Sequence, residues 1–222
     1  MAVTRFAGFP LAAFEFYDEL TVNNTKAWWT EHKGTYEAQV REPLQQLLDE
    51  LAPEFGDGSM FRPYRDIRFA KDKTPYKDHQ GAYVPTEDSI GYYVQVSAAG
   101  LFVAGGWWSG TSQQVGRWRD SVDSPVGATL EKAITVAEKK GLTTGGDVMK
   151  TRPKGVPEDH PRIDLLRHRT LTVERQYGVP TWVDTRKAFT AVRDTWRAMT
   201  PLVEWLTDHV GPADDGIPPE PR

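Results

Sequence analysis

The chain has 222 residues, of which 39% are hydrophobic and 26% charged, and its formal net charge at pH 7 is −4. These values are typical of a soluble globular protein that buries a sizeable core. The absence of cysteine excludes disulfides, thiolate metal sites and a cysteine nucleophile. The acidic balance also argues against general binding of duplex DNA, for which a protein normally presents a strongly basic face.

The N-terminal segment "MAVTRFAGFPLAAFEFYDEL" carries apolar residues, but Pro10, Glu15 and Asp18 interrupt them. No small-residue cleavage site follows, so we expect no signal peptide. Nowhere do eighteen apolar residues follow one another, and we therefore expect no membrane-spanning segment and no membrane partner. The sequence predicts a cytoplasmic protein.

Helical spacing dominates the first quarter of the chain. Apolar residues from Phe9 to Leu20 recur at steps of three and four, which predicts an amphipathic helix over 9–20. The turn "NNT" (Asn23, Asn24 and Thr25) offers a good N-cap for a second helix. Pro43 suits the first turn of a further helical stretch, in which leucines repeat until Gly56 ends it.

The period changes to two in the middle of the chain. We expect strands at "MFRPYRDIRFA" (60–70), "GAYVP", "IGYYVQVSA" and "LFVAGGWW". Short turns between strands that follow one another predict an antiparallel meander. In the last strand, Gly105 and Gly106 indicate a bulge or a close backbone approach. Trp107 and Trp108 face opposite ways, so one belongs in the core and the other is at least partly exposed.

Helical period returns over 112–122 and 125–140, before glycine and proline residues recur through 141–161 and predict a long loop. A short helix at "PRIDLLRH" and a strand at "TLTVERQY" follow. The last helix has a regular apolar face from Phe189 to Leu206, and Pro201 is expected to kink or split it. The predicted fold is α+β, with N-terminal and C-terminal helices packed on a mainly antiparallel central sheet. We expect a single domain over 1–210 and a disordered tail over 211–222.

The segment "RPYRDIRFAKDKTPYK", residues 62–77, holds six cations and two acids in an acidic chain. Arginine recognises carboxylates and phosphates through bidentate hydrogen bonds, and Pro75 stiffens the turn that carries the lysines. We therefore predict a site for a small anionic ligand, such as a phosphorylated small molecule or a nucleotide. The predicted ligand-binding residues are Arg65, Arg68, Lys71, Lys73, Tyr76 and Lys77. The competing interpretation is a solvated hairpin whose charges guard a sheet edge.

The stretch "RDIRFAKDKTPYK" resembles the signature of a widespread family of bacterial and fungal proteins known only as a domain of unknown function. Three further stretches are similar to the same family: "GFPLAAFEFYDELTVNNTKAWWTEHKGTYE", "GYYVQVSAAGLFVAGGWW" and "KGVPEDHPRIDLLRHRTL". Together they cover most of residues 6–172. The resemblance implies one domain of this length and brings no activity, cofactor or substrate with it. It makes Pro75, Tyr76 and the charged residues of the signature the matched positions to test.

If the protein turns over a substrate, Asp66, Asp72 or His160 would be the acid or base. His160 lies between Asp159 and Pro161, where it could move protons near neutral pH. The same three residues are also typical of a capped helix start.

A metal site is not predicted, because no two of the five histidines are four residues apart. His79 beside Asp78 and His160 beside Asp159 would form one only if the fold brought the two pairs together. No cofactor is predicted.

Two alternatives to a small-ligand site remain. A single-stranded nucleic-acid or RNA-binding module would combine the basic segment with stacking aromatics and lose affinity steeply with salt. An acidic chain without a known RNA motif makes it the second choice. In a protein-interaction role, the basic segment would dock an acidic partner. The sequence leaves open whether the protein is an enzyme and whether it self-associates.

Overall fold

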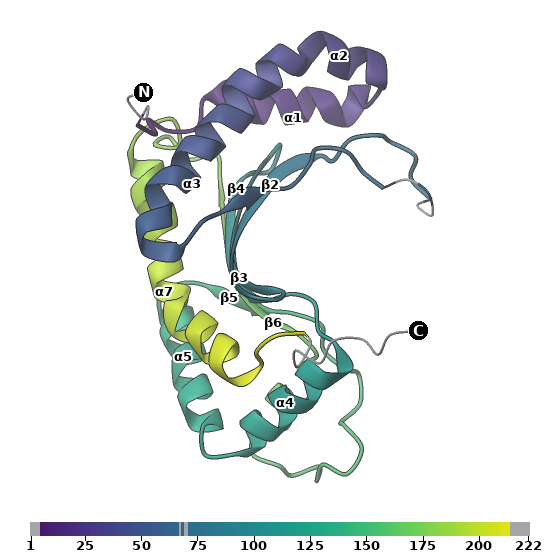
Figure 1. Cartoon of the computed structure of the whole chain (residues 1–222), viewed down its shortest axis with the longest axis vertical. Coiled ribbons are helices and arrows are strands. Elements are labelled where there is room, and N and C mark those ends of the chain that lie inside the picture. The colour runs from purple at the N-terminus through teal and green to yellow at the C-terminus, as the bar shows by residue number, and fades with distance from the viewer. Residues whose placement is uncertain (1–4, 67, 69–70, 214–222) are drawn as a thin grey trace, which may run out of the picture. The chain divides into compact units, whose positions relative to one another are not determined.

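The structure, a computed structural model, describes residues 5–66, 68 and 71–213 (Figure 1). Most of the tail that was predicted to be disordered lies outside these residues. One open sheet has the strand order β1-β2-β3-β4-β6-β5, and all of its pairings are antiparallel. The first four strands form the predicted meander, and the α+β class is confirmed.

The elements follow one another as α1 (Leu11–Asn23), α2 (Lys26–Thr35), η1 (Tyr36–Arg41), α3 (Glu42–Phe55), β1 (Ser59–Met60), β2 (His79–Glu87), β3 (Ile90–Ser97), β4 (Gly100–Trp107), α4 (Ser112–Asp123), α5 (Gly127–Lys139), β5 (Thr143–Gly145), α6 (Ile163–Leu166), β6 (Leu171–Gly178) and α7 (Lys187–His209).

The chain folds into two compact units. The first extends from the N-terminus to Val84 and adds Tyr93–Val103 and Arg175–Thr195. The second consists of Pro85–Tyr92, Ala104–Glu174 and the chain from Trp196 onward. Because β2, β3, β4, β6 and α7 supply residues to both units, the units are interleaved along the sequence. The single domain over 1–210 stays a prediction.

In the first unit, the core forms where helices meet the sheet. The Thr25 side chain accepts a hydrogen bond from the Trp28 N–H at 3.2 Å, which confirms the predicted N-cap of α2. The π-helix η1 continues α2 into α3 and keeps Tyr36 and Val40 buried. A Cβ on Gly58 would lie 2.8 Å from Leu48 of α3 and 3.1 Å from Val84 of β2, so glycine allows the chain to pass close to both side chains.

In the second unit, the core is built around buried tryptophans, of which Trp118 contacts Trp107 at 6.0 Å and Trp205 at 5.7 Å between ring centroids. Trp107 is fully buried and Trp108 is 40% exposed, as predicted for consecutive residues of a strand. A Cβ on Gly106 would meet the Leu171 carbonyl oxygen at 2.4 Å, so the predicted close backbone approach is confirmed.

The strand predicted over 60–70 is wrong for the residues that the structure describes. Ser59–Met60 pair with β2, the Phe61 N–H adds one hydrogen bond to the Gly81 carbonyl, and Tyr64 forms an isolated bridge with Tyr76. Pro63 has no N–H to donate to a ladder, and the Asp66 carboxylate accepts the Arg68 N–H at 3.2 Å in place of a partner strand. Ile67 and Phe69 lie outside the described residues.

Two further predictions need correction. The loop predicted over 141–161 begins with β5, which pairs with β6 in the register Thr143↔Glu174. Of the two effects predicted for Pro201, a kink or a split, the split does not occur, because Lys187–His209 form one helix that contains Pro201. Proline costs about 3 kcal/mol inside a helix, and burial of the neighbouring Met199, Leu202 and Val203 is large enough to offset that cost.

Candidate functional site at the basic hairpin and the adjoining sheet face

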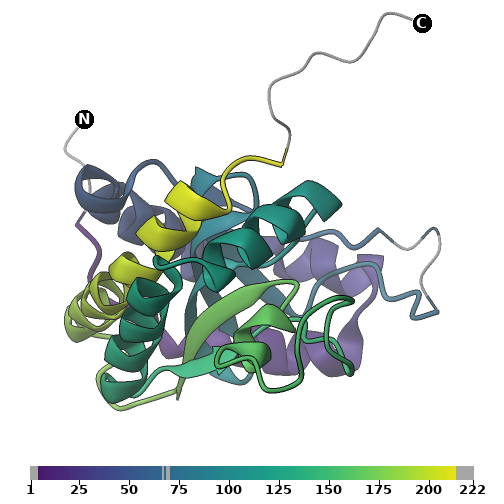
Figure 2. The same ribbon diagram turned by 90° about the horizontal axis from the view of Figure 1, so that it is seen from below.

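Residues 62–77 form a hairpin, which we call the basic hairpin. The Arg65 N–H donates to the Pro75 carbonyl at 3.0 Å, and the Lys77 N–H donates to the Pro63 carbonyl at 2.8 Å. In Figures 1 and 2, the two arms of the hairpin extend away from the sheet before β2 begins. The described residues of the segment therefore form the two arms of a hairpin.

The base of the hairpin is anchored to the turn between α1 and α2. The Asn24 side chain accepts from the Tyr76 N–H at 3.1 Å and donates to the Tyr76 carbonyl at 2.9 Å. The Tyr76 ring stacks on Trp29, with ring centroids 4.1 Å apart and planes 7° apart. Tyr76 is only 5% exposed, so this predicted ligand-binding residue holds the hairpin in place.

Both predicted anion-binding arginines form ion pairs with acids of the hairpin itself. Arg65 pairs with Asp72 and donates to the Thr74 hydroxyl at 2.7 Å. Arg68 approaches Asp66 with both Nε and Nη2, the latter at 2.6 Å. The hydrogen bond from Arg68 lowers the pKa of Asp66, and those from Thr74 lower the pKa of Asp72. Both carboxylates thus serve as ionised partners, which makes them poor candidates for a proton donor.

The remaining cations of the hairpin occupy two environments. Lys71 and Lys73 are exposed near the tip, whereas the Lys77 ammonium lies 5.1 Å from the centroid of the Phe61 ring. Burial, and then the charge of Arg62, lower the pKa of Lys77. Within the described part of the chain, neither Arg62 nor Lys77 forms an ion pair. Two neighbouring cations at the hairpin base are therefore left without an anionic partner there.

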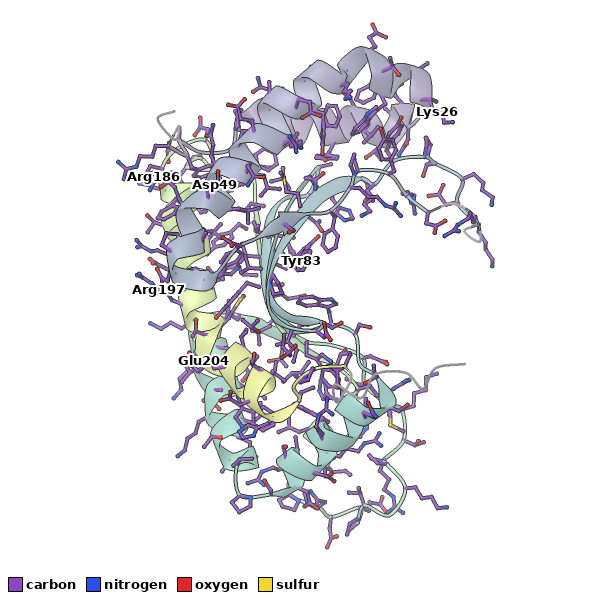
Figure 3. All side chains as sticks on the ribbon, viewed as in Figure 1. Lys26, Asp49, Tyr83, Arg186, Arg197 and Glu204 are labelled. Atoms are coloured by element: carbon purple, nitrogen blue, oxygen red, sulfur yellow. The ribbon has the colours of Figure 1, made fainter. Side chains whose placement is uncertain are left out.

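An aromatic surface adjoins these cations. The Phe61 ring stacks on Tyr83 at 5.0 Å and approaches Tyr93 at 6.3 Å between centroids, and Tyr93 contacts Phe102 at 6.2 Å. We call these four residues the aromatic face. Figure 3 shows Tyr83 on the side of the sheet away from α3. A Cβ on Gly81 would lie 2.3 Å from the Tyr93 hydroxyl, so only glycine allows this ring to cover the strand.

The sequence interpretation missed the aromatic face, although a signal for it was present. Gln80, Ala82 and Val84 are buried and alternate along β2 with the half-buried His79 and Tyr83, while Gly81 is buried as well. In a strand, alternate residues point to opposite sides of the sheet. The half-buried residues of this strand therefore mark a face that no helix fully covers.

The imidazole of His79 lies on this face beside a carboxylate. Its Nδ1 is 2.7 Å from Asp78 Oδ1, and the hydrogen bond from His79 lowers the pKa of Asp78. The next residue, Gln80, accepts from the Tyr36 hydroxyl at 2.7 Å and donates to the Phe61 carbonyl at 2.7 Å. This buried network fixes the strand at the point where His79 emerges.

His160 lies in the second unit, before α6. Its Nε2 is 2.9 Å from Asp123 Oδ1, so its carboxylate partner is Asp123 and not the adjacent Asp159. Its Nδ1 accepts the Arg162 N–H at 3.1 Å. Both ring nitrogens are therefore occupied. The N-cap of α6 is Arg162 and no described side chain caps this helix, so neither Asp159 nor His160 has the predicted capping role. Across residues 5–66, 68 and 71–213, no group of three or more histidine or acidic side chains is placed to hold a metal ion.

Three open hollows are lined by other parts of the chain than the basic hairpin. One of about 410 Å³ lies between α5 and α7, one of about 330 Å³ lies between α5 and α6, and one of about 400 Å³ lies along η1. None of the three is lined by a hairpin residue or by the aromatic face. The cations and exposed aromatic rings at the hairpin base therefore indicate a ligand site more specifically than these hollows do.

A family model described as "Conserved hypothetical protein (DUF2461)" matches residues 12–205. The chain belongs to the DUF2461 family. This confirms the predicted membership of an uncharacterised family. A search of curated proteins found no match for this DUF2461 chain, and a search of solved structures found none. Among its described residues, the DUF2461 chain has no helix that combines the length and apolar character needed to cross a bilayer.

Proposed function

We propose that this DUF2461 protein binds a nucleotide, with the phosphate at Lys77 and Arg62 and the base against Phe61. The observation that carries the proposal is the Lys77 ammonium, held 5.1 Å from the Phe61 ring and next to a second cation. A half-buried cation without a carboxylate partner is costly, and a phosphate would remove that cost. The two acids of the basic hairpin, Asp66 and Asp72, thus pair with its arginines Arg68 and Arg65. Within the described residues of the hairpin, no acid pairs with Arg62 or Lys77.

The aromatic part of the ligand follows from the exposure of Phe61, which is 39% exposed on the aromatic face. If the base of the ligand stacked on Phe61, it would displace the Lys77 ammonium group from that ring. The ammonium group would then bind the phosphate of the same ligand. Base–aromatic stacking contributes about 1–3 kcal/mol per base. Ring and phosphate together therefore fit this site better than phosphate alone.

Arg65 and Arg68 have a secondary role in this proposal. Their ion pairs with Asp72 and Asp66 are solvent-exposed, and such pairs contribute little to stability. A phosphate can therefore compete for these guanidinium groups at low cost. We expect their removal to weaken binding less than removal of Lys77 or Arg62.

The test is a thermal-shift and calorimetric titration with ADP, adenosine and inorganic phosphate. We expect ADP to raise the melting temperature more than either fragment does. Lys77→Met and Arg62→Gln should each weaken ADP binding about tenfold, which corresponds to about 1.4 kcal/mol. Phe61→Leu should bring the affinity for ADP close to that for phosphate. Lys154→Met, which removes an exposed lysine of the second unit, is the matched control and should bind like the wild type.

Single-stranded nucleic acid is the second candidate, and the continuous row of rings from Phe61 through Tyr93 to Phe102 favours it. Successive bases stack on such rows in proteins that bind single strands. This candidate predicts that a short oligonucleotide binds more tightly than ADP and loses affinity more steeply with salt. If the oligonucleotide and ADP bound with equal affinity and equal salt dependence, the single-stranded nucleic-acid proposal would be rejected and the nucleotide proposal retained.

A further inference from the structure

We propose that Asp78 and His79 form a proton-transfer dyad that hydrolyses a phosphodiester bond of a ligand held on the aromatic face. This inference rests on the proposed function, because the hairpin cations would hold the phosphate group. No motif in the sequence identifies the pair, since histidine and aspartate are simply adjacent.

The geometry of the pair assigns a role to each atom. An ionised carboxylate only accepts hydrogen bonds, so the 2.7 Å contact places the proton on His79 Nδ1. In the neutral ring, Nε2 then carries the lone pair and is the basic atom. No described side chain or carbonyl takes Nε2 as a hydrogen-bond partner. The arrangement is the base and orienting carboxylate that many hydrolases use.

The dyad lies on the side of β2 that the ligand would occupy. Because His79 and Gln80 are neighbours in β2, their side chains point to opposite faces of the sheet. The Phe61 N–H donates a hydrogen bond to the Gly81 carbonyl at 3.0 Å. His79 is therefore two residues from the point where Phe61 and the Tyr93 ring meet the strand. Lys77 is two residues away in the other direction. A phosphate bound by Lys77 would lie within reach of an imidazole on the same segment.

One buried phenol of the first unit lies within electrostatic range of Asp78. The Tyr17 hydroxyl and the Trp29 Nε1 have no hydrogen-bond partner among the described residues, although the two side chains are only 1% and 3% exposed. An unsatisfied buried donor costs about 1–3 kcal/mol. Burial, Tyr36 and the charge of Asp78 raise the pKa of Tyr17, so the phenol stays protonated and lies within electrostatic range of the dyad.

The proposed step consumes one water molecule and needs no other reactant. Water transfers a proton to His79 Nε2 while its oxygen forms a bond to phosphorus. The bond between phosphorus and the leaving oxygen breaks, and that oxygen takes up the proton that the imidazolium returns through solvent. The products are a phosphomonoester and an alcohol. Asp78 stabilises the imidazolium, and Lys77 and Arg62 stabilise the charge on the phosphoryl oxygens.

The test measures release of p-nitrophenolate from bis(p-nitrophenyl) phosphate in the presence of a chelator, in parallel with ADP binding. The wild type should release it above the level of heat-denatured protein. His79→Asn should lower kcat at least 100-fold, and Asp78→Asn should lower it about tenfold, with ADP binding unchanged in both. His32→Asn, at a half-buried histidine of α2, should behave like the wild type.

The two proposals fail separately in this experiment. ADP binding without p-nitrophenolate release, or release that His79→Asn does not change, overturns the dyad and leaves the proposed function standing. Release that depends on His79 in a protein that does not bind ADP supports the dyad and overturns the nucleotide as ligand. Melting temperatures of the variants show whether each is folded.

Discussion

Replacement of Asn24 tests whether the turn between α1 and α2 positions the basic hairpin. Asn24→Ala removes two hydrogen bonds to the Tyr76 backbone, at 2.9 and 3.1 Å. Each contributes about 0.5–1.5 kcal/mol net, so the hairpin base should lose about 2 kcal/mol of local stability. Amide hydrogen exchange at Arg65 and Lys77, whose N–H groups bond across the hairpin, should then accelerate about 30-fold.

Asn23→Ala is the matched control for this variant. The Asn23 side chain donates only to the Glu19 carbonyl within α1, at 2.9 Å, and does not contact the hairpin. Exchange at the hairpin amides should therefore stay within about twofold of the wild type. Equal acceleration in the two variants, or none in Asn24→Ala, would show that the turn does not hold the hairpin.

Two further variants test other parts of the first unit. The hydrogen bond from Arg186 lowers the pKa of Glu50, so this carboxylate stabilises the fold above its unfolded pKa of about 4.3, and the contribution is lost as the pH falls toward the lower folded value. Glu50→Gln should lower the free energy of unfolding at pH 7 by about 2 kcal/mol and remove that part of the pH dependence; an unchanged denaturation profile would contradict the assignment. Gly81→Ala should displace the Tyr93 ring and cost about 1–3 kcal/mol, measured by urea unfolding, and a neutral result would mean that the ring moves aside freely.

Much of the fold follows from the spacing of apolar residues. The predicted helices and the strands of the meander are present because their apolar faces are regular. The exceptions have local causes. Pro63 and the Asp66 side chain replace a strand by a short bridge, and β5 is too short, at three residues, to show a period. Pro201 stays within α7 because the apolar residues around it are buried.

The candidate site was only partly predictable. Charge density identified the basic hairpin, but it does not show which cations are paired with Asp66 and Asp72, because those pairings depend on the turn geometry. Tyr76 has a structural role that depends on Trp29, which lies far away in the sequence. The predicted site did not include Arg62 and Phe61. Both lie beside Lys77 because the Phe61 N–H donates to the Gly81 carbonyl, a contact that the sequence pattern does not show.

The most direct measurement is a crystal structure of the protein with ADP. We expect a phosphate oxygen in hydrogen-bond contact with the Lys77 ammonium and close to the Arg62 guanidinium, and we expect the adenine ring to stack on Phe61. A nucleotide bound elsewhere, or crystals grown in saturating ADP that show Lys77 still over an uncovered Phe61 ring, would contradict it.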